Sequence, residues 1–74
     1  MEFNRGDYAK LAEGASQEVG VVWEIHPTDI ESIQVYWWAG GNRWSKYYEP
    51  KNLTLVPPTE IPDYAIKLRD SLGL

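Results

Sequence analysis

Residues 31–48 contain the pattern that most constrains the fold of this chain. In the first part of this segment the side chains alternate, so that Ile33, Val35 and Trp37 share one side and the residues between them share the other. A period of two is typical of a β-strand. The tetrapeptide at 39–42, Ala-Gly-Gly-Asn, suits a tight turn, because glycine and asparagine tolerate a positive φ. We therefore predict a β-hairpin whose second strand follows this turn.

The chain has to build its core from few residues. It has 74 residues and no cysteine, and its only histidine is His26. A domain of this size buries roughly 60% of the surface that its unfolded chain exposes. Neither a disulfide nor a zinc site of the usual cysteine and histidine ligands can add stability. Four tryptophans and five tyrosines can do so, because each ring buries about 150–250 Å². We expect rings in the core, and no metal or cofactor.

The chain divides into a β-rich body, residues 1–58, and a helical tail, residues 59–74. Alternation and flanking turn residues predict five strands, at 8–11, 19–25, 31–38, 43–48 and 54–56. Small, polar or proline residues predict loops at 12–18 and 26–29 and a single helical turn at 50–53.

The tail changes to a helical period. Its apolar residues recur at a spacing of three or four, with charged residues on the other side: Ile61, Ala65, Leu68 and Leu72. Pro62 suits the first turn of a helix and Gly73 suits its carboxyl-terminal cap. A helix of about ten residues is too short to persist alone in water. We expect its apolar stripe to pack on the β-rich body or on a neighbouring subunit.

Three stretches between residues 3 and 56 carry the sequence pattern of a known fold. Phe-Asn-Arg-Gly-Asp-Tyr-Ala-Lys-Leu at 3–11 is similar to an opening "xxxGDxVxL", and Gly-Val-Val-Trp-Glu-Ile at 20–25 is similar to a second strand "GxVxxI". Residues 33–37, 43–44 and 52–56 are similar to the ending "VxVxW…W…NLxLV". In these stretches the chain resembles the SH3-like small β-barrels.

This resemblance implies a mainly β fold, a five-stranded SH3-like barrel with a single-turn helix before the last strand and a short C-terminal α-helix. Tudor-like and KOW-like modules share the pattern. So do short SH3-fold proteins encoded by tailed bacteriophages, which are similar in length to this chain. By this resemblance we expect a non-enzymatic protein-interaction or structural module, encoded by a phage as an accessory or virion component.

The rings of the hairpin are expected on both of its sides. Trp37 belongs to the core side, and Trp44 faces it from the returning strand. Rings that stay exposed are the usual mark of a binding surface. We expect a partner-binding surface with ring anchors and a charged rim, formed by Trp23, Tyr36, Trp38, Arg43, Trp44, Tyr47 and Glu49. In the alternative interpretation, the C-terminal helix lies over the outward-facing rings as a lid.

Two other kinds of reader would use the same rings. A methyl-lysine cage of the Tudor type would take its rings and a carboxylate from Trp23, Tyr36, Trp38 and Tyr47 with Glu24 or Glu49. A KOW-like RNA contact would use Arg43, Lys46 and Lys51 near the hairpin. Eleven acidic side chains outnumber seven basic ones, however, and the net charge of −4 disfavours a binder of the phosphate backbone.

Catalytic and membrane features are not found in the sequence. His26 is followed by proline, and no glycine-rich phosphate loop accompanies it, so we do not expect an enzyme. The longest apolar run, residues 19–23, is too short to span a bilayer, and the N-terminus does not resemble a signal peptide. We expect a soluble protein of the cytoplasm, including a host cytoplasm or a virion. Its expected partner is another protein or a second copy of itself, in a homo-oligomer, and not nucleic acid or a membrane.

Overall fold

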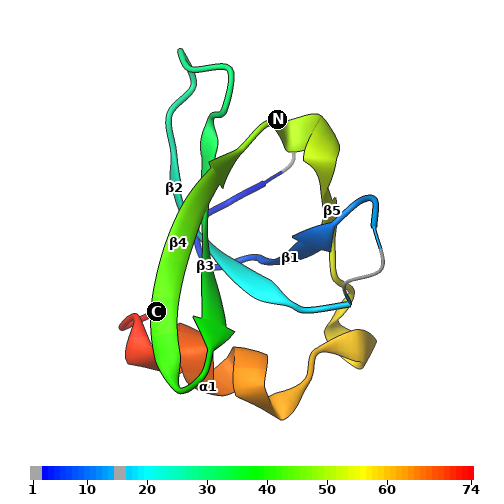
Figure 1. The fold of residues 1–74 in the computed structure, drawn as a ribbon, viewed down its shortest axis with the longest axis vertical. Coiled ribbons are helices and arrows are strands. Elements are labelled where there is room, and N and C mark those ends of the chain that lie inside the picture. The colour runs from blue at the N-terminus through cyan, green and yellow to red at the C-terminus, as the bar shows by residue number, and fades with distance from the viewer. Residues whose placement is uncertain (1–2, 15–16) are drawn as a thin grey trace.

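The computed structural model describes residues 3–14 and 17–74, and its strands form one antiparallel sheet (Figure 1). The five strands are β1 (Tyr8–Leu11), β2 (Gly20–Ile25), β3 (Ile33–Ala39), β4 (Asn42–Tyr48) and β5 (Leu53–Leu55). They lie in the order β4-β3-β2-β1-β5. The predicted strands are confirmed, with ends that differ by one or two residues. Of the predicted loop at 12–18, residues 15 and 16 lie outside the described residues.

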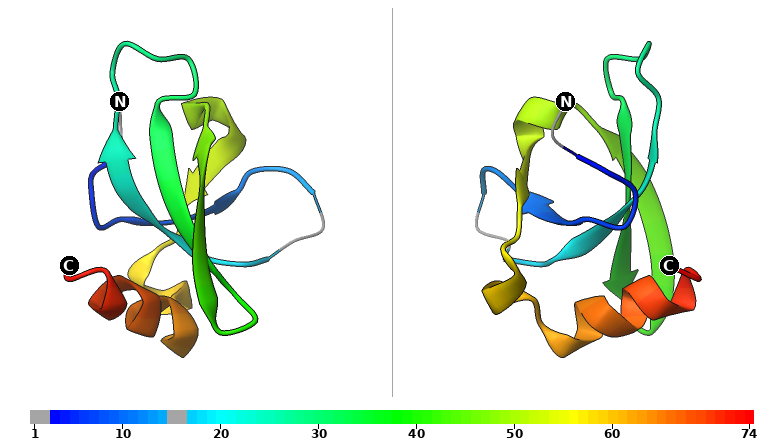
Figure 2. Two further views of the ribbon diagram at one scale, coloured as in Figure 1. Left: turned by 60° about the vertical axis from the view of Figure 1, so that its left-hand side comes forward. Right: turned by 180° about the vertical axis from the view of Figure 1, so that it is seen from behind.

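The sheet bends strongly along its width. β1 runs across the direction of β3 and β4, and β5 lies on the far side of the core from β4 (Figures 1 and 2). β4 and β5 are the two edge strands, and within the described part of the chain they are not paired with each other. The fold is therefore mainly β, as expected, and its single antiparallel sheet is open. Its closure into a barrel stays a prediction.

Three helical segments follow the hairpin. A 3-10 turn, η1 (Pro50–Asn52), connects β4 to β5 as predicted, and a second one, η2 (Pro58–Glu60), follows β5. The short helix η2 was not predicted, because the double proline at 57–58 was interpreted as the end of a strand and as a stiff linker. The α-helix α1 (Asp63–Ser71) confirms the predicted tail helix. It ends in a left-handed Gly73 (φ 80°), which lets the Leu74 amide donate to the Arg69 carbonyl at 3.3 Å.

The main core lies under β3, on the side predicted from its alternation. Ile33 and Val35 are fully buried, and Trp37 is 3% exposed. They belong to one buried cluster: Phe3, Ala9, Val22, Ile33, Val35, Trp37 and Leu53. Gly20 lies against this cluster, and a Cβ atom there would come within 2.9 Å of the Trp37 ring and 2.7 Å of the Tyr36 carbonyl oxygen. The close approach of β2 to β3 therefore requires glycine at this position.

The helix α1 packs on the other side of the sheet of its own chain, against β2 and β3 (Figures 1 and 2). Ala65 and Leu68 of its apolar stripe are fully buried. The Tyr64 hydroxyl accepts a hydrogen bond from the Val19 amide at 2.9 Å, and the Arg69 Nε donates one to the Gly6 carbonyl at 3.0 Å. The helix thus joins the amino-terminal turn and β2 to the end of the chain.

Candidate functional site

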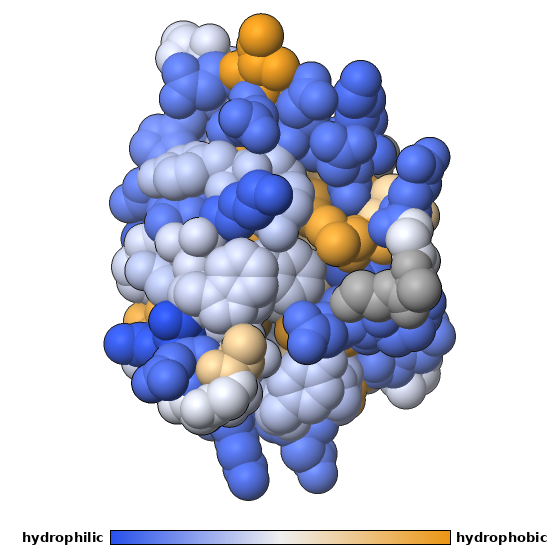
Figure 3. Space-filling view, viewed as in Figure 1, coloured by the Kyte–Doolittle hydropathy of each residue, from blue (hydrophilic) through white to orange (hydrophobic). Residues whose placement is uncertain are grey.

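The candidate site is built on the β3–β4 hairpin, whose register decides where each ring lies. Trp37 pairs directly with Trp44, so these two rings share the core side of the hairpin. Trp38 pairs with Arg43 and Tyr36 pairs with Ser45 on the opposite, outer side. The space-filling view shows pale ring-shaped side chains gathered over β3 and β4, with hydrophilic residues around them (Figure 3).

The core-side rings differ in how far they are covered. The ring centroids of Trp37 and Trp44 are 6.1 Å apart, and Tyr48 meets Trp37 edge-on at 5.9 Å. Trp44 is nevertheless 43% exposed, because β4 is an edge strand and no further strand of the described chain covers it. Burial raises the pKa of Tyr48 above its ordinary value of 10.0, and a smaller opposing effect comes from the Trp37 side chain.

On the outer side, Trp23 and Tyr36 form one ring pair. Their centroids are 5.8 Å apart at an interplanar angle of 90°. The pairing of β2 with β3 shifts register between Val22 and Glu24, so that Trp23 is the extra residue of a bulge next to Tyr36. The Arg5 guanidinium lies 4.2 Å from the centre of the Trp23 ring. A cation of the same chain therefore already contacts this ring.

The helix covers the hairpin end of the outer side. Arg43 donates from Nη1 to the Ser71 carbonyl, the last residue of α1, at 2.9 Å. Trp38, the direct partner of Arg43 across the strands, is half-buried. The lid interpretation therefore describes only one end of the outer side, because Tyr47, farther along β4, remains 41% exposed.

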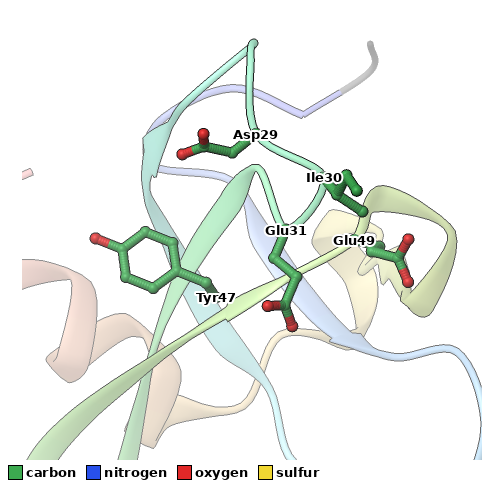
Figure 4. A pocket seen from close by; sticks show the side chains of 5 residues that line it. All are labelled: Asp29, Ile30, Glu31, Tyr47 and Glu49. Carbon is green, nitrogen blue, oxygen red and sulfur yellow. The ribbon is translucent and has the colours of Figure 1, made fainter.

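Tyr47 borders a hollow of about 660 Å³ at the other end of β4 (Figure 4). Its remaining lining residues are one apolar and three acidic side chains: Asp29, Ile30, Glu31 and Glu49. Three of them come from the connection between β2 and β3, while Tyr47 and Glu49 come from the end of β4 (Figure 4). The Tyr47 ring also contacts His26, at 5.5 Å between centroids. The hollow thus combines an aromatic wall with negative charge.

The predicted site residues fall into four groups. Tyr47 and Glu49 lie together at the hollow, and Trp23 lies with Tyr36. Trp38 and Arg43 form a third group near the end of α1. Trp44 lies on the core side of β4 against Trp37, and so on the opposite face of the strand from Tyr47. The structure thus brings these residues together in pairs along the hairpin rather than in one cage.

Three residues of the hollow were not predicted from the sequence as site residues. Asp29 was interpreted as part of a strand break and Glu31 as the first residue of the third strand, while Ile30 between them was assigned to neither. Ile30 is 79% exposed. An isolated apolar residue between two carboxylates in a polar loop was the available signal, because nothing in such a loop buries it. That these residues lie beside Tyr47 depends on strand pairing, which no local pattern shows.

The cations near the hairpin interact with groups of their own chain. The Lys46 ammonium lies 5.6 Å from the centre of the Tyr48 ring. The Lys51 ammonium lies 3.9 Å from a Glu49 carboxylate oxygen, and Arg43 is bound to the helix end. The positive charge of the hairpin is therefore spread over several sites rather than gathered in one basic face.

No model of a known protein family, no curated protein and no solved structure matches the chain. Within residues 3–14 and 17–74, no cluster of three or more histidine, cysteine, aspartate or glutamate side chains is placed to hold a metal ion. None of the helices in this described part combines the length and the apolar character needed to cross a membrane.

Proposed function

We propose that this chain is a non-enzymatic protein-interaction or structural module of the SH3-like small-barrel class, which binds through the rings of β4. The order of five short antiparallel strands and the single helical turn before β5 support this class. The proposal includes closure of the barrel at the end of β4 that η1 joins to β5, beyond the edge formed by residues 43–47. It also includes a phage origin, as an accessory or virion component, which rests on chain length and sequence resemblance.

The observation that carries the proposal is the exposure of β4. Trp44 and Tyr47 are 43% and 41% exposed on opposite faces of an edge strand. A domain of 74 residues needs its large rings for its own core. Exposed tryptophan and tyrosine are also the residue types most often found as anchors in protein interfaces. Rings that remain exposed in so small a fold therefore support a role in binding another protein.

The charges around Tyr47 indicate which protein segments this surface favours. Asp29, Glu31 and Glu49 surround the hollow, and the whole chain carries a net charge of −4. A cationic side chain would find an aromatic wall and carboxylates within the same hollow. We therefore expect partner segments that are extended, with a lysine or arginine next to an apolar residue.

Selection from a displayed library of random dodecapeptides tests the proposal. The full chain is immobilised, and the counter-selection uses the double variant Trp44→Ser with Tyr47→Ser. Peptides enriched on the wild type and not on the double variant are the expected result, with basic and apolar residues over-represented. The matched control is Ile66→Ser, which removes an exposed apolar residue of α1 and should retain the same peptides. Equal enrichment on wild type and double variant would contradict the proposal.

A modified-peptide reader is the second candidate, and the ring and carboxylates at the hollow favour it. A trimethyl-lysine peptide should then bind more tightly than the unmodified peptide, and Tyr47→Ser should abolish the difference. Equal affinity for both peptides would rule out this candidate. Nucleic acid is disfavoured by the acidic hollow and by the scattered cations. Salt-sensitive binding of a single-stranded oligonucleotide would reverse that judgement.

A further inference from the structure

The outer edge of β4 is a template for another strand. β4 ends the sheet, and no other strand of the described chain lies beyond it (Figure 2). Gly40 and Gly41 form its two-residue turn with φ values of 58° and 81°, so that Ala39 directly faces Asn42. A turn of this kind makes the two residues that flank it the first hydrogen-bonding pair of the hairpin ladder.

The direction of the backbone groups of β4 follows from that first pair. Hydrogen-bonding and non-hydrogen-bonding pairs alternate along an antiparallel ladder. The backbone N–H and C=O groups of Asn42, Trp44 and Lys46 therefore point toward β3. Those of Arg43, Ser45 and Tyr47 point away from the sheet. All three lie in an extended strand, so they can receive a partner strand over their whole length.

We propose that the strand received there is the β4 of a second copy of this chain, antiparallel to the first about a two-fold axis at Ser45. This inference rests on the proposed function and names its partner. In this arrangement Ser45 faces the Ser45 of the second copy. Arg43 faces the second copy's Tyr47, and Trp44 faces the second copy's Lys46. Because the axis is two-fold, each of these pairs occurs twice.

The pairs formed in this way are complementary on both faces of the joined sheet. Arginine opposite tyrosine on the outer face and tryptophan opposite lysine on the core face are both cation–ring pairs. Directly opposite side chains in an antiparallel pair lie close enough for such contacts. Lys46 already lies over a ring of its own strand, that of Tyr48, at 5.6 Å. A lysine on an edge strand usually prevents pairing with another strand, but in this arrangement Lys46 would face the Trp44 ring of the second copy.

Neighbouring registers lack this complementarity. With the axis moved to Lys46, the two Lys46 ammonium groups would face each other, and like charges directly opposite are destabilising. With the axis moved to Trp44, Tyr47 would face Gly41 of the turn, which has no side chain to contact it. The sequence of β4 therefore favours the register centred on Ser45. The contact would cover Trp44 and Tyr47, the two most exposed rings of the strand.

A single cysteine provides a direct test of this register, because the chain contains none. Ser45 is exposed, and its side chain accepts only a surface hydrogen bond from the Gln34 side chain at 3.0 Å. Across the two-fold axis its Cα atoms would be about 5.5 Å apart, within disulfide range. Ser45→Cys should therefore give a disulfide-linked dimer under mild oxidation. Lys67→Cys, on the exposed side of α1, is the control and should remain monomeric.

The solution mass of the wild type across concentration is the second measurement. We expect a monomer–dimer equilibrium with a dimer dissociation constant below about 1 mM. Trp44→Lys places two lysines opposite each other and should raise the dimer dissociation constant by about tenfold or more, with an unchanged circular dichroism spectrum. The exchange variant, Trp44→Lys with Lys46→Trp, restores the cation–ring pair and should recover dimerisation.

The results separate this inference from the proposed function. A wild type that is monomeric up to about 1 mM, with no cross-linking of Ser45→Cys, overturns the dimer. If the peptide selection still succeeds with that monomer, the interaction surface stands and only its proposed partner is wrong. If Ser45→Cys and Lys67→Cys cross-link equally, the register is wrong, since collision alone then explains both. A dimer that Trp44→Lys leaves intact places the contact elsewhere and also overturns the inference.

Discussion

Both strands of the hairpin carry large aromatic side chains, but β3 is buried much more than β4. On β3, Trp37 is 3% exposed, whereas its direct partner on β4, Trp44, is 43% exposed. β3 lies between two strands and has the core on one side and α1 on the other. Among the described residues β4 has a strand neighbour on one side only, and α1 meets it at Arg43, which is hydrogen-bonded to the Ser71 carbonyl. Position in the sheet, rather than residue type, decides whether a tryptophan here stabilises the fold.

This difference separates the two roles that rings can have in a small domain. On β3, Trp37 excludes water from the core and cannot be removed without leaving a cavity, whereas Tyr36 and Trp38 are half-buried on the outer side. On β4, Tyr48 packs against the main core, whereas Trp44 and Tyr47 remain 43% and 41% exposed and so available for contact. The same composition therefore provides a core on one strand and a contact surface on the next. Four substitutions sharpen or break this distinction.

Trp37→Ala should have the largest effect. The side chain is almost fully buried among the residues of the main core, so its removal leaves a large cavity. We expect a loss of about 3–5 kcal/mol in the free energy of unfolding. Urea unfolding followed by circular dichroism measures it. A loss below about 1 kcal/mol would mean that β3 is no more important to stability than β4.

Gly20→Ala tests how closely β2 approaches β3. Its new methyl group would lie 2.6 Å from a methyl carbon of Val35 and 2.7 Å from the Tyr36 carbonyl oxygen. One of these is backbone, so the strands have to separate. We expect a loss of about 1–3 kcal/mol in the free energy of unfolding. Gly41→Ala is the control: its methyl group would meet no atoms, but its φ is positive, so its cost reports backbone strain without crowding. No loss on Gly20→Ala would show that the two strands pack more loosely.

Trp44→Ala should cost much less than Trp37→Ala. Its contact with the Trp37 ring, at 6.1 Å between centroids, is lost, but the residue is already 43% exposed, so the cavity left behind is small. Aromatic pairs contribute about 0.5–1.5 kcal/mol, so we expect about 1 kcal/mol in the free energy of unfolding. Thermal and urea unfolding at low chain concentration exclude any contribution from association. A cost equal to that of Trp37→Ala would place Trp44 in the core and remove the basis of the proposed surface.

Tyr48→Phe should have the smallest effect, and only at alkaline pH. The folded state raises the pKa of Tyr48 above 10.0, mainly through burial, so it favours the neutral phenol. This contribution is complete below the unfolded pKa and is lost as the pH rises through the folded pKa. Stability should therefore fall less steeply with pH above about pH 10 in Tyr48→Phe than in the wild type. Urea unfolding at several alkaline pH values measures the slope, and identical slopes would contradict the prediction.

Local patterns in the sequence predicted most of the fold. The alternation in β3 gave the correct buried side, and the two glycines of the turn gave the hairpin. Ala65 and Leu68 of the predicted stripe are fully buried in α1. These features depend on neighbouring residues, which a period of two or of 3.6 can describe.

What the sequence could not show depends on distant residues. Alternation places Trp44 on the core side, but only the sheet order reveals that no further strand of the described chain lies over its exposed part. The bulge that sets Trp23 beside Tyr36 is a property of strand pairing. The hollow joins the connection before β3 to the end of β4, and so Ile30 to Tyr47. Periodicity contains no information about such contacts, because each strand is interpreted separately.

The hydrogen bond from Arg69 to Gly6 joins positions 63 residues apart. Closing a loop of that length costs more chain entropy than closing the two-residue turn of the hairpin. We therefore expect the hairpin to form early in folding and the contact between the chain's two end segments to form late. In the native state we expect the same hydrogen bond to couple the local unfolding of those two segments. A fluctuation that frees the turn at Gly6 also removes an anchor of α1, so slow amide exchange at one end implies slow exchange at the other.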